Sequence, residues 1–174
     1  MTLSDVIFSQ IDFRTFSNIW YWLAVAVTWA SVSHWIIGVP FDMIYGARRH
    51  GGQAMLDLDQ ITAINVRRLM TIAGTPGLIF VGLVAFFITM AGMLGFYYGL
   101  ELAQGLFLLA FPLVIVGALT WRACQRLSAA PLTGEALVKA LSNLRFWIQV
   151  IAMTAIFVTA VYGMYANLSR MMVF

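Results

Sequence analysis

The chain has 174 residues, of which 62% are hydrophobic and only 10% are charged, and its formal net charge is +3. Soluble domains have about 45–50% apolar and about 25% charged residues, so this composition excludes an ordinary soluble domain. It predicts an all-α integral membrane protein that forms a single domain over residues 1–174. Because most of the positive charge flanks the apolar runs, we expect contacts with membrane lipids and protein partners, and no contact with nucleic acid.

Long runs without charged residues predict four membrane-spanning helices. A helix needs about 20 apolar residues to cross a hydrocarbon core about 30 Å thick. The first such run lies between Arg14 and Asp42, and three more follow. Pro112 lies within the third run, where it removes one helical hydrogen bond and is expected to bend the helix. The predicted spans cover residues 19–39, 76–98, 102–121 and 146–168.

The basic residues predict the orientation of the chain, because cytoplasmic loops retain Lys and Arg. Only Arg14 and Arg170 lie in the predicted tails. The two long loops hold the other eight, which are Arg48, Arg49, Arg67, Arg68, Arg122, Arg126, Lys139 and Arg145. Both loops are therefore predicted to be cytoplasmic and both termini to be periplasmic. The first six of these arginines are candidates for contact with anionic headgroups or a cytosolic partner.

The two loops also carry amphipathic patterns that predict short interfacial helices. In the loop before the fourth span, Leu137, Leu141 and Leu144 recur with helical spacing after Thr133, a suitable N-cap. The segment LDLDQITAINVRRLM in the first loop has a weaker pattern. The simpler interpretation of this second segment is a solvated connector that touches the headgroups.

Small residues at intervals of four predict faces where helix backbones approach closely, either within the chain or against another protein. Packing within the chain is the commoner of the two cases. The candidate residues are Ala26 and Ala30 in the first span, Ala91, Gly95 and Gly99 in the second, and Ala155, Thr159 and Gly163 in the fourth.

His34 lies on the same predicted face as Ala26 and Ala30 and admits two interpretations. It could be an axial ligand to a haem or a chlorophyll-type pigment such as bacteriochlorophyll, which a neutral imidazole above small residues suits. Alternatively, it forms an interhelical or interfacial hydrogen bond, with Ser31 one turn away as a partner. The second interpretation is favoured, because a bis-histidine haem needs a second histidine at membrane depth and His50 lies in the basic loop.

The predicted spans contain no Asp, Glu, Lys or Arg. Proton-coupled carriers, ion pumps and intramembrane hydrolases generally keep ionisable groups there. The chain also has no phosphate-binding glycine loop, no paired-histidine metal motif and no serine nucleophile elbow. The single Cys124 excludes an intramolecular disulfide. An enzyme or a transporter is therefore disfavoured, and neither a cofactor nor a metal is expected apart from the pigment or haem considered at His34.

Four stretches carry a resemblance that covers most of the chain. They are IDFRTFSNIWYWLAVAVTWASVSHWIIGVPFDMI, ARRHGGQA, LTGEAL and IFVTAVYGMYANLS. In these stretches the chain resembles a group of small alphaproteobacterial membrane proteins, of the Rhodobacter and Roseobacter type, that are labelled "component of SufBCD complex". The resemblance implies the inner membrane of a bacterium and a link to iron–sulfur cluster assembly. A cluster needs about four protein ligands, so Cys124 alone does not support cluster ligation.

Two functions follow as expectations. The first is a non-catalytic accessory or scaffold subunit of a larger membrane assembly, which could be respiratory, photosynthetic or linked to iron–sulfur assembly. The alternative is a membrane protein that binds a cofactor through His34 or lets a small molecule permeate near the bent third span.

Overall fold

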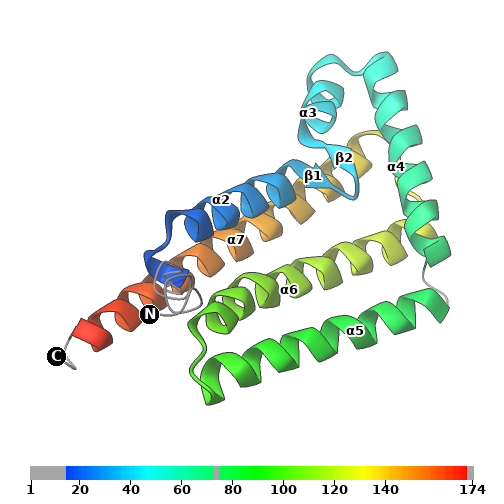
Figure 1. The fold of residues 1–174 in the computed structure, drawn as a ribbon. Coiled ribbons are helices and arrows are strands. Elements are labelled where there is room, and N and C mark those ends of the chain that lie inside the picture. The colour runs from blue at the N-terminus through cyan, green and yellow to red at the C-terminus, as the bar shows by residue number, and fades with distance from the viewer. Residues whose placement is uncertain (1–14, 73–74, 172–174) are drawn as a thin grey trace, which may run out of the picture.

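The computed structural model of the chain describes residues 15–72 and 75–171 (Figure 1). The predicted all-α class is confirmed, with six α-helices in these residues. The predicted orientation also used Arg14 and Arg170 in the tails. Arg14 and both termini lie outside the described residues, as does the Arg170 side chain. The elements are η1 Thr15–Ser17, α2 Ile19–His34, β1 Trp35–Ile36, β2 Val39–Pro40, α3 Phe41–His50, α4 Gly52–Ile72, α5 Thr75–Gly92, η2 Met93–Tyr97, α6 Glu101–Ala129 and α7 Gly134–Met171.

Three helical segments in the described residues are long and apolar enough to cross a membrane, which suggests a multi-pass membrane protein. They are Gly77–Tyr97, Glu101–Ala129 and Gly134–Ser169, and they contain the second, third and fourth predicted spans except for the first and last residues of the second. The helix at the first predicted span, α2, has 16 residues. At 1.5 Å per residue it is about 24 Å long, which is shorter than a hydrocarbon core of about 30 Å.

The prediction of a single helix over residues 19–39 is wrong in its last part, because the chain leaves α2 after His34. The segment that follows forms an antiparallel hairpin, in which Trp35 pairs with Pro40 and Ile36 with Val39. Pro40 pushes the residue before it, Val39, out of the helical conformation, which suits the second strand of this hairpin. The hairpin gives way directly to α3.

The hairpin turn consists of Ile37 and Gly38, whose φ angles are +54° and +71°. Positive φ at both central residues matches the twist of two-residue hairpins. Glycine adopts this conformation readily, but a β-branched residue such as Ile37 rarely does. The Ile37 side chain is 3% exposed within the hydrophobic core, and this burial holds the turn in place.

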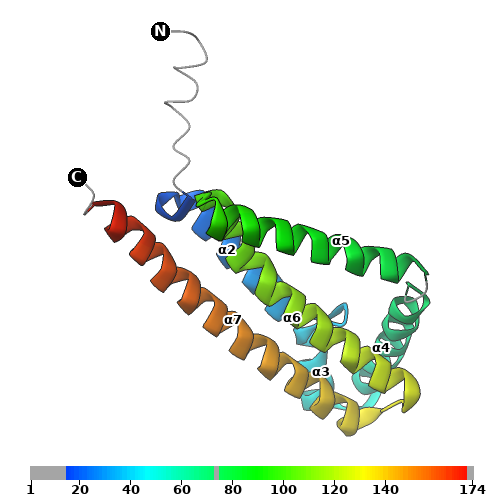
Figure 2. The same ribbon diagram turned by 90° about the horizontal axis from the view of Figure 1, so that it is seen from below.

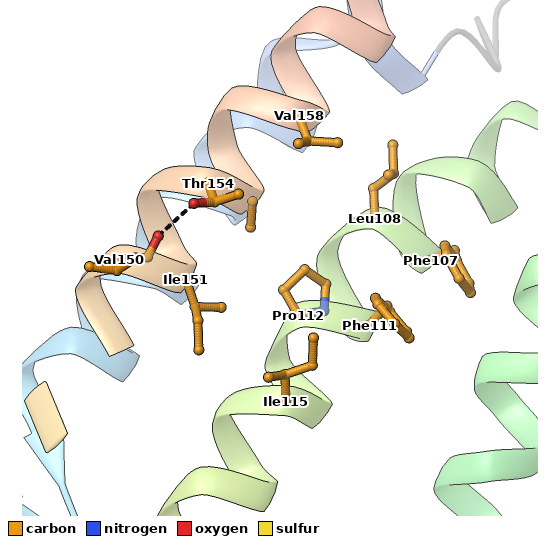
Figure 3. Close-up of a pocket in the computed structure, with 10 residues that line it drawn as sticks. Phe107, Leu108, Phe111, Pro112, Ile115, Val150, Ile151, Thr154 and Val158 are labelled. Carbon is orange, nitrogen blue, oxygen red and sulfur yellow. Dashed lines mark hydrogen bonds between the residues drawn. The ribbon is translucent and has the colours of Figure 1, made fainter. Parts of the chain in front are cut away.

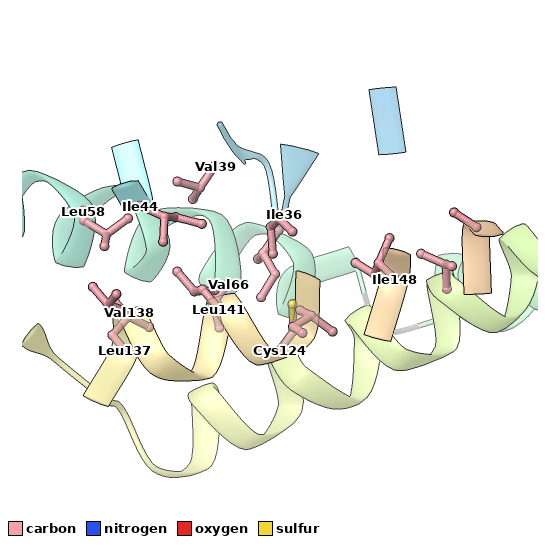
Figure 4. Close-up of a cluster of buried hydrophobic side chains, with 14 of the residues drawn as sticks. Ile36, Val39, Ile44, Leu58, Val66, Cys124, Leu137, Val138, Leu141 and Ile148 are labelled. Atoms are coloured by element: carbon pink, nitrogen blue, oxygen red, sulfur yellow. The ribbon is translucent and has the colours of Figure 1, made fainter. Parts of the chain in front are cut away.

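The most deeply buried side chains lie at one end of the molecule, where α3, α4, the hairpin and the first turns of α7 meet (Figure 4). Leu58 of α4, Ile44 of α3 and Leu137 and Leu141 of α7 are all at most 1% exposed. The helical pattern predicted for α4 is therefore present, but the interpretation of this segment as a solvated connector is wrong. α4 packs against α3, α6 and α7.

The predicted short helix after Thr133 and the predicted fourth span form one continuous helix, α7, of 38 residues. No glycine or proline interrupts the sequence between them, and a single buried face runs on from Leu141 to Ile148 and Ala155. The separation of these two elements in the prediction is wrong for this reason. Both oxygens of the Asp59 carboxylate on α4 accept the N–H of Gly134, at 3.0 and 3.2 Å, where α7 begins.

The long helices are packed in the order α5, α6, α7 and α2. Figure 2 shows α6 between α5 and α7, so that α5 lies at the edge. At one end, the N–H of Phe16 in η1 donates to Glu101 Oε1 at 2.9 Å, and Ser17 Oγ donates to Asn167 Oδ1 at 2.9 Å. The hairpin after α2 contacts α7 toward the opposite end. The two ends of α2 therefore lie at opposite ends of the molecule.

Candidate functional site

The helices α3 and α4, the last turns of α6 and the first turns of α7 lie together at one end of the molecule (Figure 1). Basic residues gather on these helices, and we call this end the basic end. All eight loop residues used to predict the orientation lie there, two each on these four helices. Arg48, Arg49, Arg67, Arg68, Arg122 and Arg126, the candidates for headgroup or partner contact, are all exposed. The basic end also carries the four acidic residues Asp42, Asp57, Asp59 and Glu135.

Two of these carboxylates are engaged with polar groups of the protein. Asp59 binds the N–H of Gly134, and Asp57 accepts a hydrogen bond of 2.8 Å from Gln53 Nε2 on its own helix. In the part of the chain that the structure describes, neither forms an ion pair with a basic side chain. Eight cations against four anions leave the basic end with a net positive charge, which attracts anionic lipid surfaces.

Arg145 differs from the other basic residues because it packs inward. Its guanidinium carbon lies 3.3 Å from the centre of the Phe41 ring, a cation–π contact between α7 and α3. Its Nε is buried without a hydrogen-bond partner. Sequence reasoning treated Arg145 only as a topology residue and missed this contact, since the two residues are far apart along the chain.

A pocket of about 230 Å³ lies at the basic end between the hairpin turn and α4, and we call it the hairpin pocket. Ile37 and Gly38 line it from the turn, and Asn65, Arg68 and Leu69 line it from α4. Sequence reasoning missed this pocket because it continued the first helix through these turn residues. The signal that could have revealed it is Gly38 followed closely by Pro40.

His34 is the last residue of α2 and its side chain is exposed. Its ring makes an edge contact with the ring of Trp35, with centroids 5.8 Å apart. Within the described residues, no group of three or more His, Cys, Asp or Glu side chains could hold a metal ion. His34 thus lies on the outer surface of the molecule and not between its helices.

Ala26 and Ala30, predicted to form a packing face with His34, are exposed as well. α2 packs with the face that carries Val25 and Trp29, which are 3% and 4% exposed. Of the two alternatives predicted for Ala26 and Ala30, packing within the chain does not occur, because larger side chains fill the space beside α7. Packing against another protein stays a prediction.

Small residues of the second predicted span do lie at a close approach between helices. Ala91 is 5% exposed, and a Cβ atom on Gly95 would lie only 2.8 Å from the backbone nitrogen of Gln104 in α6. Gly99 does not extend this seam. It has φ +72° in the turn before α6, and a Cβ atom there would meet no atom within 4 Å.

The candidates on α7 lie on one buried face. Ala155 and Thr159 are 6% and 2% exposed. A Cβ atom on Gly163 would lie 3.0 Å from Cδ1 of Phe16, so this glycine gives η1 room to pack. These three residues contribute to contacts within the chain.

An apolar groove of about 330 Å³ lies between the middle parts of α6 and α7 (Figure 3). Pro112, Phe111 and Leu108 line it from α6, and Ile151 and Thr154 line it from α7. The Thr154 hydroxyl donates to the carbonyl of Val150 in its own helix at 2.9 Å. The groove therefore presents almost wholly apolar atoms and contains no ionisable side chain.

A scan against protein-family models, a search of curated proteins and a search of solved structures found no match to this chain. Its function is therefore inferred from the arrangement of its own residues.

Proposed function

We propose that this chain is a non-catalytic accessory or scaffold subunit of a larger membrane assembly. The observation that carries the proposal is the position of α5 at the edge of the helix layer. Only 6% of the most apolar stretch of Gly77–Tyr97 is buried there. α5 packs mainly against α6. Its other sides are free to pack against helices of a second protein, because association in lipid depends on shape and close contact.

The free surface of α5 carries exposed aromatic side chains. Phe80, Phe86 and Phe87 are 67%, 61% and 56% exposed, and the rings of Phe86 and Phe87 are in edge contact with centroids 5.5 Å apart. Rigid aromatic side chains are typical anchors of protein interfaces. We assign this surface to the partner and name it the α5 face.

The proposal includes four membrane crossings, with the basic end in the cytoplasm and both termini in the periplasm of a bacterial inner membrane. A membrane crossing by α2 is supported because the two ends of this helix lie at opposite ends of the molecule. The extended residues Trp35 and Ile36 add roughly 3.3 Å each to the length of α2. The collection of eight basic residues at one end supports the orientation.

The resemblance to proteins labelled "component of SufBCD complex" suggests an iron–sulfur assembly as a cytosolic partner for the basic end. The role proposed for this chain there is attachment and not cluster ligation, since Cys124 is its only cysteine and is buried. The alternative function, a pigment or haem on His34, requires a binding surface around a side chain that is exposed at the end of α2.

Native purification tests the scaffold proposal. The tagged full-length chain is extracted from its own membranes in a mild detergent and run on a native gel beside Phe86→Ala, Phe87→Ala and a control, Phe157→Ala. Phe157 is 69% exposed on α7, away from the α5 face. We expect the wild type and the control to migrate in an assembly much larger than a 19.4 kDa monomer, and the two α5 variants to be released from it.

A wild type that migrates as a monomer would contradict the proposal, as would equal retention of all three variants. A pair of differently tagged copies that purify together, with no other protein, would assign the α5 face to self-association instead.

A further inference from the structure

The hairpin pocket combines the chemistry of a phosphate site with a position at the end of a membrane-embedded helix. We propose that it binds the phosphate of an anionic phospholipid headgroup, with Arg68 and Asn65 as the recognising side chains. The pocket, about 230 Å³ in volume, is large enough for a phosphate group and part of the glycerol attached to it.

Both polar side chains of the pocket are available to a ligand. In the described part of the chain, neither the Arg68 guanidinium nor the Asn65 amide has a hydrogen bond or ion pair with the protein. A guanidinium presents several N–H groups in a planar fork that matches the oxygens of a phosphate. The Asn65 amide adds two further N–H donors, so the two side chains can bind different oxygens of one phosphate.

The turn of the hairpin positions these groups. A Cβ atom at Gly38 would lie 3.1 Å from Asn65 Nδ2, so the missing side chain lets the Asn65 amide approach the turn backbone. Ile37 is held in a left-handed conformation that β-branched residues rarely adopt. Strain of this kind is concentrated at ligand-binding sites, where the surrounding structure maintains it. Here the strained residue, Ile37, forms part of one wall of the pocket.

The surroundings of the pocket suit a lipid better than a free phosphate. The hairpin directly follows α2, and Trp35 in its first strand is 55% exposed, as aromatic residues at a membrane surface are. Two of the five lining residues, Ile37 and Leu69, are apolar. Leu69 is only partly buried and can contact the glycerol and the start of the acyl chains. Arg67, the neighbour of Arg68, is also exposed and strengthens the local positive potential.

The proposed topology would place the bound lipid in the cytoplasmic leaflet of the membrane. The inference rests on the proposed function for this point alone. A lipid titration in detergent reports on the pocket whichever way the chain is oriented, so failure of the pocket and failure of the topology can be told apart.

The test uses the purified, delipidated full-length chain and native mass spectrometry to measure retained lipid. The probes are phosphatidylglycerol, phosphatidylcholine and inorganic phosphate. The variants are Arg68→Gln and Asn65→Ala. The control is Lys139→Gln, which removes the same charge from an exposed residue of the basic end that does not line the pocket. Circular dichroism spectra and thermal transitions show whether each variant is folded.

We expect one phosphatidylglycerol to bind the wild type more tightly than phosphatidylcholine does. Its affinity should fall about tenfold in Arg68→Gln, the loss of one charge-assisted hydrogen bond, and by a smaller factor in Asn65→Ala. The control should retain the wild-type affinity, and excess inorganic phosphate should not displace the lipid. Equal losses in Arg68→Gln and Lys139→Gln would overturn the proposal, because binding would then follow net charge. Displacement by inorganic phosphate, or no loss in either pocket variant, would overturn it as well.

Discussion

The side-chain amide of Gln104 donates a hydrogen bond of 2.8 Å to the backbone carbonyl of Gly95, across the turn that joins the helices of the second and third predicted spans. Gly95 lies in the π-helical segment η2, where the N–H of Tyr98 binds the carbonyl of Met93 and that of Leu100 binds Leu94. The wider turn leaves the Gly95 carbonyl to the Gln104 side chain. The same glycine lets the two backbones meet, so close approach and hydrogen bonding occur at one point.

A first prediction concerns this contact. Gly95→Ala should lower the free energy of unfolding by about 1–3 kcal/mol, the usual range for overpacking, because the new Cβ atom would lie 2.8 Å from the nitrogen of Gln104. The control, Gly82→Ala, meets no atom within 4 Å. It should be neutral or stabilising by up to about 1 kcal/mol, since alanine favours helices. Unfolding in detergent measures both, and equal effects would contradict the close approach.

The sequence predicted the positions of the long helices well, because charge-free apolar runs and helix length leave few alternatives. The prediction failed at the end of α2. The run from Trp35 to Val39 is continuously apolar, and hydropathy alone does not distinguish a helix from a buried hairpin. The prediction also did not identify the face with which α2 packs inside the chain. Small residues at intervals of four indicated Ala26 and Ala30, but Val25 and Trp29 have the same spacing and bury more surface.

The candidate site was only partly predictable for a related reason. The clustering of the six arginines at one end of the molecule could be predicted from their positions in the chain. The hairpin pocket was missed, because hydropathy does not reveal the turn that brings Gly38 close to Asn65 and Arg68. The packing of α4 was likewise underestimated, since Leu58 in an amphipathic pattern fits a lipid surface and a protein core equally well.

The capping of α7 by a side chain of α4 gives a second prediction. Asp59→Ala removes the carboxylate that binds the Gly134 N–H at 3.0 Å and should destabilise the fold by about 1 kcal/mol, as the loss of an N-cap does. Asp57→Ala removes the same charge two residues away, from a carboxylate that binds Gln53 on its own helix, and should cost less than half as much. Thermal unfolding followed by circular dichroism compares the two. Similar losses would mean that charge at the basic end, and not capping, accounts for the effect.

A third prediction concerns His34. Because its side chain is exposed at the end of α2 beside Trp35, His34→Gln should accumulate in the membrane nearly as well as the wild type. The purified wild type should be colourless, without a Soret or near-infrared band. A stoichiometric pigment or haem that survives purification of the wild type, and is lost in His34→Gln, would establish His34 as a ligand instead.

The claim on which the whole account depends is that the chain crosses the membrane four times with the basic end on one side. Cysteine labelling from the two sides of the membrane tests this claim most directly. Cys124 is fully buried, so Cys124→Ala gives a suitable background. Single substitutions are made at four exposed positions, Ser17→Cys and Tyr98→Cys at one end and Arg49→Cys and Lys139→Cys at the basic end. With four crossings, a membrane-impermeant maleimide should label the first two in intact cells and the last two only after the membrane is opened. Labelling of Ser17→Cys and Arg49→Cys from the same side would show that α2 does not cross the membrane and would contradict the account.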